Sequence, residues 1–89
     1  MEKLFDLGNV VITPSLNDFL DRMEVMNLLQ RHSTGDYGDS PKEDVQMNVE
    51  AIRTGEDRVF SSYTIKNQKI FVITEWDRSY TTLMFANEY

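Results

Sequence analysis

The apolar and polar residues near the N-terminus predict a strand that leads directly into a helix. Residues 10–12 are consecutive β-branched residues, which favour a pleated surface, so a strand is expected over residues 7–13. Thr13 and Pro14 then mark a helix start, with Thr as the cap and Pro at the first helical position. Pro is tolerated there because its missing N–H would have no intrahelical partner.

The apolar residues after Pro14 follow helical spacing in two stripes that are out of phase. The first stripe comprises Leu16, Phe19, Leu20 and Met23, and the second comprises Val25, Leu28, Leu29 and His32. A break between residues 23 and 25 explains the change of phase. We therefore expect two short helices, or one kinked helix, over this part of the chain.

The clearest helix start lies at Ser40, which is followed by Pro41 and by Glu43 three residues after the Ser. This spacing is typical of a capping box, in which the Ser hydroxyl and the Glu carboxylate each accept an otherwise unbonded backbone N–H. Gly55 is a natural end for the helix. One longer helix is therefore predicted between these two points.

Two side chains of the longer helix do not fit a simple apolar stripe. The stripe is predicted to comprise Val45, Val49 and Ile52. Met47 points to the opposite side, where an apolar side chain gains little unless another surface covers it. Asn48 falls at the edge of the stripe, where its amide needs partners, and we expect a bond to the loop at residues 35–39.

From residue 58 onward the apolar residues recur with a period of two, which is typical of strands. Three strands are predicted, over residues 58–66, 69–76 and 80–86. A tight turn at Asn67-Gln68 and a second turn at Asp77-Arg78 connect them. Residues 70–73 of the middle strand are all apolar, so both faces of this strand need cover. We expect the N-terminal segment or a second copy of the chain to supply the second cover.

Taken together, these elements predict a single α+β domain of residues 1–89. Its expected order is an N-terminal strand, two short helices, one longer helix and a three-stranded antiparallel meander packed on the helices. The chain is too short for two independent cores.

The net charge of −6 is concentrated between residues 36 and 57, where seven acidic residues stand against Lys42 and Arg53. A phosphate backbone is recognised by clustered Lys and Arg, so direct nucleic-acid backbone binding is not expected. The alternatives are a solvated helix face, a basic protein partner, or an acidic mimic of DNA.

The chain contains no cysteine, which leaves a disulfide framework or a cysteine-ligated metal without ligands. Its first residues contain no apolar run typical of a signal peptide, and no stretch approaches the length of a membrane span. We therefore expect a cytoplasmic protein without membrane contact. No sequence motif for a cofactor is present, and no cofactor is expected.

His32 is the only histidine, and it lies near the end of a predicted helix beside an apolar stripe. It is a candidate general acid or base. Alternatively, it is a structural histidine whose positive charge the dipole at the end of the helix would stabilise. Asp36 lies four residues further on, but no other residue nearby has the spacing of a metal ligand, so no metal site is predicted.

A second polar cluster surrounds the turn between the last two predicted strands. Asp77 and Ser79 are ordinary turn residues, and Arg78 can pair with Glu75 or Asp77. Alternatively, Arg78 presents its planar guanidinium to a carboxylate or phosphate, with Glu75 or Asp77 orienting it.

The spacing of several short motifs resembles that of a small bacterial family described as plasmid-related, which is found on plasmids, integrated elements and phages. The matching residues are Leu7-Gly8, Val11 to Pro14, Arg31-His32, Gly35-Asp36-Tyr37-Gly38, Glu43-Asp44, Asn48, Ile73-Thr74-Glu75, Asp77-Arg78-Ser79, Thr81-Thr82 and Glu88-Tyr89. Three positions depart from the family pattern: Tyr37 replaces a usual Trp, Trp76 a small residue and Asn87 a usual Pro. The resemblance implies a setting on a bacterial mobile element but no particular activity.

Three functional hypotheses follow. The leading one is a non-catalytic binding or accessory protein, self-associating or bound to another macromolecule, with binding residues at Asp36, Tyr37, Asn48, Asp77 and Arg78. The enzyme alternative is a small hydrolase or nuclease-like protein that uses His32 and Arg78, with Glu75 as a further catalytic candidate. The third is an acidic inhibitor that mimics DNA.

Overall fold

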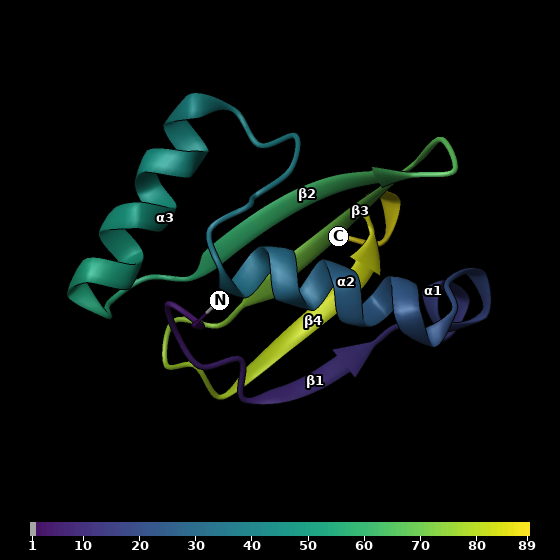
Figure 1. Ribbon diagram of the computed structural model, residues 1–89, viewed down its shortest axis with the longest axis horizontal. Helices are drawn as coiled ribbons and strands as arrows, with labels where there is room; N and C mark the ends of the chain where they lie inside the picture. The colour runs from purple at the N-terminus through teal and green to yellow at the C-terminus, as the bar shows by residue number, and fades with distance from the viewer. Residues whose placement is uncertain (1) are drawn as a thin grey trace.

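The computed structural model describes residues 2–89 as one four-stranded sheet with three α-helices (Figure 1). In chain order the elements are β1 (Asn9–Ile12), α1 (Pro14–Phe19), α2 (Arg22–Ser33), α3 (Lys42–Thr54), β2 (Val59–Ile65), β3 (Gln68–Thr74), β4 (Tyr80–Phe85) and the 3₁₀ helix η1 (Ala86–Glu88). The predicted α+β class and element order are confirmed. No helix within residues 2–89 is long and apolar enough to cross a membrane.

The sheet is mixed, with the strand order β1-β4-β3-β2. β2, β3 and β4 form the predicted antiparallel meander. β1 adds a fourth strand, which pairs parallel to β4 with Val11 opposite Thr82. The prediction of a three-stranded sheet was therefore incomplete, because this pairing joins segments about seventy residues apart that local patterns do not connect.

One face of the sheet is covered by α1 and α2, with α2 lying across the strands (Figure 1). The buried residues of this main core are Leu16, Leu20, Leu28, Tyr63, Ile70, Val72 and Leu83. Alternation along the strands brings Ile70 and Val72 of β3 to this face, because successive side chains of a strand point to opposite faces. Burial of these apolar side chains is the main stabilising term of the fold.

The opposite face carries Phe71 and Ile73 of β3, beside Phe60 of β2 and Met84 of β4 in the strand register. The ring of Tyr89 packs edge-on against Phe60 and Phe71. The expectation that the N-terminal segment covers this face is wrong. That segment packs on the helical side instead, where the Leu4 N–H donates to the Ser33 carbonyl at the end of α2.

The first two helices are separate, but they divide at Leu20 and Asp21 rather than at residues 23–25. Asp21 caps α2 by accepting the Glu24 N–H at 2.8 Å, while the Glu24 carboxylate accepts the Asp21 N–H at 2.9 Å. This is a true capping box. It places Met23 in the first turn of α2, not in the first stripe as predicted.

The capping box predicted at Ser40 does not form. Helix α3 begins at Lys42, its cap position is Pro41, and no side chain caps it. The Ser40 hydroxyl instead donates to the Tyr37 carbonyl at 2.9 Å, because Ser40 belongs to a loop that pairs with the sheet. The end of the helix at Gly55 is confirmed.

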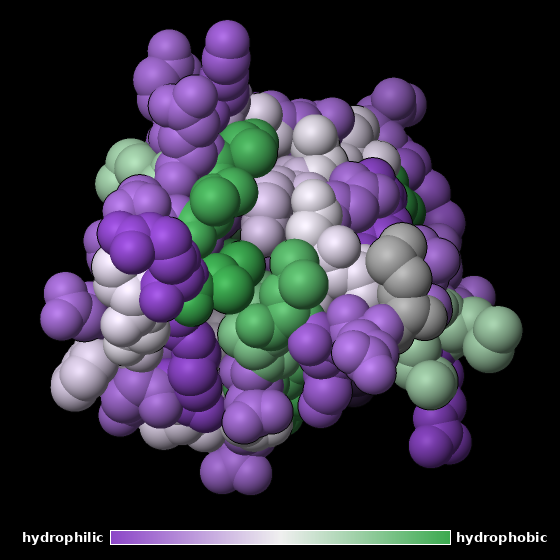
Figure 2. Space-filling model, turned by 60° about the vertical axis from the view of Figure 1, so that its left-hand side comes forward, coloured by the Kyte–Doolittle hydropathy of each residue, from purple (hydrophilic) through white to green (hydrophobic). Residues whose placement is uncertain are grey.

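Helix α3 lies beside the β2 edge of the sheet, apart from α1 and α2 (Figure 1). The residues of the second core cluster are Tyr37, Ala51 and Val59, with Phe5, Val45 and Ile52 packed against them. Val49 is 55% exposed, so its predicted burial is wrong; the buried positions of α3 are Asn48 and Ala51. Figure 2 turns the α3 side toward the viewer and shows hydrophobic side chains in a strip bordered by hydrophilic ones.

The two turns of the meander place residues in the left-handed region. Lys66 and Asn67 both have positive φ, as in the hairpin turns that match strand twist, so this turn lies one residue before its predicted place. Arg78 also has a positive φ, at the predicted turn between β3 and β4.

Candidate functional site

The structure separates the side chains that the sequence singled out into four places. They are the interior under α2 for His32, the loop after α2 for Asp36 and Tyr37, the inner side of α3 for Asn48, and the β3–β4 turn for Glu75, Asp77 and Arg78.

His32 lies at the end of α2 with no exposed surface. Its Nδ1 is 2.6 Å from the Ser61 hydroxyl of β2, and its Nε2 is 2.9 Å from the Thr74 hydroxyl of β3. The Thr74 hydroxyl is 2.7 Å from that of Thr81 on β4, which donates to the Leu7 carbonyl at 2.7 Å. A buried chain of hydrogen bonds thus connects α2 to three strands and to the segment before β1.

The directions of these bonds follow from the single proton that each hydroxyl carries. The Thr81 hydroxyl uses its one proton to donate to the Leu7 carbonyl, so it accepts the proton of the Thr74 hydroxyl. The Thr74 hydroxyl has then no proton left for His32, so it accepts the Nε2–H of the ring. His32 Nδ1 is left as the acceptor of the Ser61 proton. Burial lowers the pKa of His32 to about 3, which keeps the ring neutral as this pattern requires. No lone pair or N–H of the ring remains for a substrate.

Arg78 uses its guanidinium on backbone carbonyls. Its Nη1 donates to Asp57, Glu75 and Trp76, and its Nη2 donates to Ala51 at 2.9 Å. The expected pairing with the carboxylates of Glu75 or Asp77 does not occur. Arg78 instead connects the β3–β4 turn to the end of α3 and to the loop before β2.

The ring of Phe5 contacts both His32 and Arg78. Its centroid lies 5.3 Å from that of the imidazole and 5.7 Å from the guanidinium carbon. The two residues of the enzyme hypothesis therefore contact the same aromatic side chain, and His32 has no surface on which to meet a ligand together with Arg78.

The remaining two residues of the turn cluster have different surroundings. Asp77 is exposed and accepts both the N–H and the hydroxyl of Ser79, which lowers the pKa of the Asp77 carboxyl. Glu75 is half-buried, and its backbone pairs with Tyr80 and Arg78. Asp77 thus acts as the turn residue that the sequence predicted.

The loop after α2 is held by a bidentate ion pair. Arg31 Nε lies 2.7 Å and Nη2 3.3 Å from the carboxylate of Asp36, and this hydrogen bonding lowers the pKa of Asp36. The Arg31 guanidinium also stacks on the ring of Tyr63, whose hydroxyl donates to the Asp36 carbonyl at 2.7 Å. Tyr37 is buried in the second core cluster. Both predicted binding residues of this loop are therefore occupied by internal contacts.

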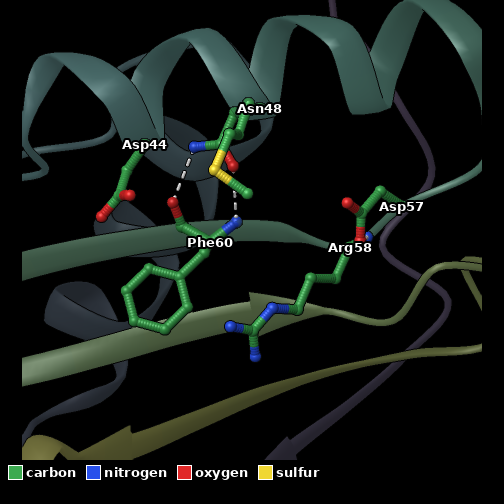
Figure 3. A pocket seen from close by; sticks show the side chains of 6 residues that line it. Asp44, Asn48, Asp57, Arg58 and Phe60 are labelled. Carbon is green, nitrogen blue, oxygen red and sulfur yellow. Dashed lines mark hydrogen bonds between the residues drawn. The ribbon is translucent and has the colours of Figure 1, made fainter.

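Asn48 bonds a strand edge and not the loop that the sequence analysis expected. Its Nδ2 donates to the Phe60 carbonyl at 2.7 Å, and its Oδ1 accepts the Phe60 N–H at 2.9 Å (Figure 3). The amide side chain thus takes the place that a neighbouring strand would have beside β2. Its expected bond to backbone is confirmed, but its partner lies after the helix and not before it.

A groove follows the side of α3 that carries Met47. One hollow, of about 110 Å³, is lined by Asp44, Met47, Asn48, Asp57, Arg58 and Phe60. A wider one, of about 490 Å³, is lined by Glu43, Gln46, Met47, Glu50, Ala51, Thr54, Glu56 and Asp57. The two share Met47 and Asp57, and together they are called the α3 groove below.

The α3 groove combines an apolar centre with an acidic border. Met47 lines both hollows, and its side chain is 60% exposed. The carboxylates along the border belong to Glu43, Asp44, Glu50, Glu56 and Asp57. Glu50 pairs with Arg53 one turn further along the helix. The other carboxylates give this side of α3 a negative field.

Arg58 is the one cationic residue in the lining of the α3 groove. Its side chain runs along the sheet toward the ring of Phe60 (Figure 3), and the guanidinium carbon lies 5.3 Å from that ring and 5.7 Å from Tyr89. Its Nη1 donates to the Tyr89 hydroxyl. Within residues 2–89 no ion pair joins Arg58 to a carboxylate.

Sequence reasoning recognised two parts of this groove, the outward position of Met47 and the excess of acidic residues, but it did not place them at one site. Arg58 and Phe60 gave no signal, because they looked like ordinary residues at the start of a strand. Within the described residues, no group of three or more acidic or histidine side chains is placed to hold a metal ion.

Comparison with known proteins adds no relative: no protein-family model matches the chain, and neither a curated protein nor a solved structure matches it. The resemblance to the plasmid-related family therefore stays a prediction.

Proposed function

We propose that this chain is a non-catalytic, cytoplasmic binding protein whose α3 groove takes a basic, partly apolar segment of a protein partner. The observation that carries the proposal is the 60% exposure of Met47 at the centre of a groove bordered by carboxylates.

Met47 supplies the apolar anchor of the proposed contact. A long unbranched thioether adapts to the shape of an incoming side chain, and methionine is enriched at protein interfaces. Phe60 forms part of the floor beside it. A partner side chain placed here would remove both from water, which is the main source of affinity at the centre of an interface.

The border of the groove selects the charge of the partner. Its carboxylates attract Lys and Arg and repel a phosphate backbone, so a basic protein segment fits and a nucleic acid does not. Arg58 adds a single position at which the partner could present a carboxylate. One cation among several anions fixes orientation better than it adds affinity.

The internal contacts of the catalytic candidates favour binding over catalysis. His32 is buried and fully hydrogen-bonded, and the Arg78 guanidinium is bonded to backbone carbonyls. A hydrolase or nuclease built on these two residues would need both to leave the contacts that hold the fold. The resemblance to the plasmid-related family adds to the proposal that the partner acts on a bacterial mobile element.

The proposal is tested by capture of partners from bacterial lysate with the tagged chain, followed by quantitative mass spectrometry. Met47→Glu places a charge at the centre of the groove, and we expect it to reduce recovery of the partner by about tenfold or more. Met26→Glu is the matched control, because Met26 lies on α2 and is 58% exposed. It should leave recovery unchanged.

Two further results decide the matter. Recovery should fall as salt is raised, since charge attraction across the border is screened by ions. A protein that binds the wild type and both variants equally, or a lysate that yields no specific protein, contradicts the proposal.

A further inference from the structure

The β1 edge of the sheet is open. The N–H groups of Asn9 and Thr13 donate to Ser79 and Leu83 on the β4 side. Hydrogen-bonding direction alternates along a strand, so the N–H and C=O groups of Val10 and Ile12 point away from β4. Figure 1 shows β1 as the outermost strand, with no further strand beside it.

The side chains of β1 are exposed on both faces of the sheet. Val10 is 46% exposed and Val11 is 47% exposed, although they point to opposite faces. β-branched side chains on an open edge are a template for another strand, and natural edges usually carry a charge, a Pro or a bulge, or are very short, to prevent it. The strand Asn9–Ile12 carries no charge, Pro or bulge, and its length of four residues is the one such protection it has.

We propose that two copies of this chain pair through β1, antiparallel and across a two-fold axis at Val11. In this register Val10 lies opposite Ile12 of the second copy, and the two outward-facing residues exchange N–H···O=C bonds on each side of the axis. Val11 faces its own counterpart as a non-hydrogen-bonded pair. The two sheets then continue into one.

Charge favours a second copy as the occupant. Residues 7–17 contain no charged side chain, although the chain as a whole has a net charge of −6. Two copies can therefore meet along this segment without placing like charges directly opposite each other. The pairing ends where Pro14 lacks an N–H, so the ladder is short and the dimer weak. This inference goes beyond the proposed function and uses a different surface, so either can fail alone.

The absence of native cysteine makes a direct test possible. The Cα atoms of a non-hydrogen-bonded antiparallel pair lie about 4.5 Å apart, within the range that a disulfide needs. Under mild oxidation, Val11→Cys should form a covalent dimer at least about tenfold faster than Val49→Cys. Val49 is a control of similar exposure that lies on α3.

A second measurement does not depend on cross-linking. The wild-type chain is expected to show a concentration-dependent dimer by light scattering or ultracentrifugation up to about 1 mM, the range of weak association. Val11→Lys should raise the dissociation constant by about tenfold or more, because two cations would face each other at the axis. Val11→Thr, which stays β-branched and uncharged, should change it little.

Circular dichroism of each variant separates loss of pairing from loss of folding. A wild-type chain that stays monomeric over the whole range overturns the inference. So does a Val49→Cys variant that cross-links as fast as Val11→Cys, or a dimer that Val11→Lys does not weaken.

Discussion

The two edges of the sheet are treated in opposite ways. Along β2, Phe60 bonds to the Asn48 side chain, and Ser62 bonds to the backbone of Tyr37 and Asp39. The outward backbone groups of Val10 and Ile12 on β1 face away from the rest of the sheet.

The two edges differ in whether polar groups of the same chain cover their outward backbone groups. Asn48 and the loop around Gly38 are used to close an edge that would otherwise accept another strand. β1 has no charged residue that would hinder pairing, and only its length of four residues limits it. The β2 edge is therefore closed at Phe60 and Ser62, and the β1 edge is the one that we propose for pairing.

The largest effect on this contrast is expected from Gly38→Ala. Gly38 has a positive φ, and an added Cβ would meet the Ser62 carbonyl and the Tyr63 ring. Backbone strain and the clash together should lower the free energy of unfolding by about 3 kcal/mol, measured by urea denaturation.

Gly55→Ala is the control for that measurement. Gly55 also has a positive φ, but a Cβ there meets nothing within 4 Å. It should cost only about 1 kcal/mol, the price of the left-handed conformation. Equal losses in the two variants would mean that the loop does not approach β2 as closely as described.

The next effect concerns the side chain that takes the place of a strand. Asn48→Ala leaves the Phe60 N–H and C=O without partners beside a buried position, and it should lower the free energy of unfolding by about 2 to 3 kcal/mol. Glu50→Ala, an exposed change on the same helix, should leave the free energy of unfolding nearly unchanged. If Asn48→Ala also costs so little, water satisfies Phe60 and the edge is not closed by Asn48.

A smaller effect is expected from pH, acting on the hydrogen-bond chain that joins the strands between the two edges. The pKa of folded His32 is about 3, below its ordinary value of 6.5, so the unfolded chain binds a proton first as pH falls. The stabilisation is therefore complete above pH 6.5 and is lost as pH falls toward 3. Between pH 7 and pH 5 the free energy of unfolding should drop by about 2 kcal/mol.

His32 is the only histidine, and carboxyl groups ordinarily titrate below this range. The slope should therefore disappear in His32→Gln, even though that variant is less stable at every pH. A slope that persists in the variant would assign the pH dependence to other groups.

Local patterns predicted most of the helices and strands, but they did not predict what lies along the two edges of the sheet. Pro14 and Gly55 were placed correctly because a helix start and a helix end depend on backbone geometry close by. Asp21 and Glu24 have the spacing of a capping box, but the helix break was predicted from the apolar stripes alone and was therefore placed at residues 23–25. Ser40 had the same spacing, but its hydroxyl was needed by the loop beside β2.

The site was harder to predict, because its contacts are between distant segments. Asn48 was recognised as a polar residue in need of partners, yet its bond to Phe60 depends on how α3 lies against the sheet. The burial of His32 likewise depends on hydroxyls from three strands, which no spacing along α2 reveals.

Amide hydrogen exchange by NMR reports on both edges of the sheet in one sample. The amides of Phe60 and Ser62 should be protected at every protein concentration, since their N–H groups are bonded within the chain. The amides of Val10 and Ile12 should exchange fast in dilute solution and become slower as the concentration rises. Fast exchange of Val10 and Ile12 that does not change with concentration would contradict pairing through β1.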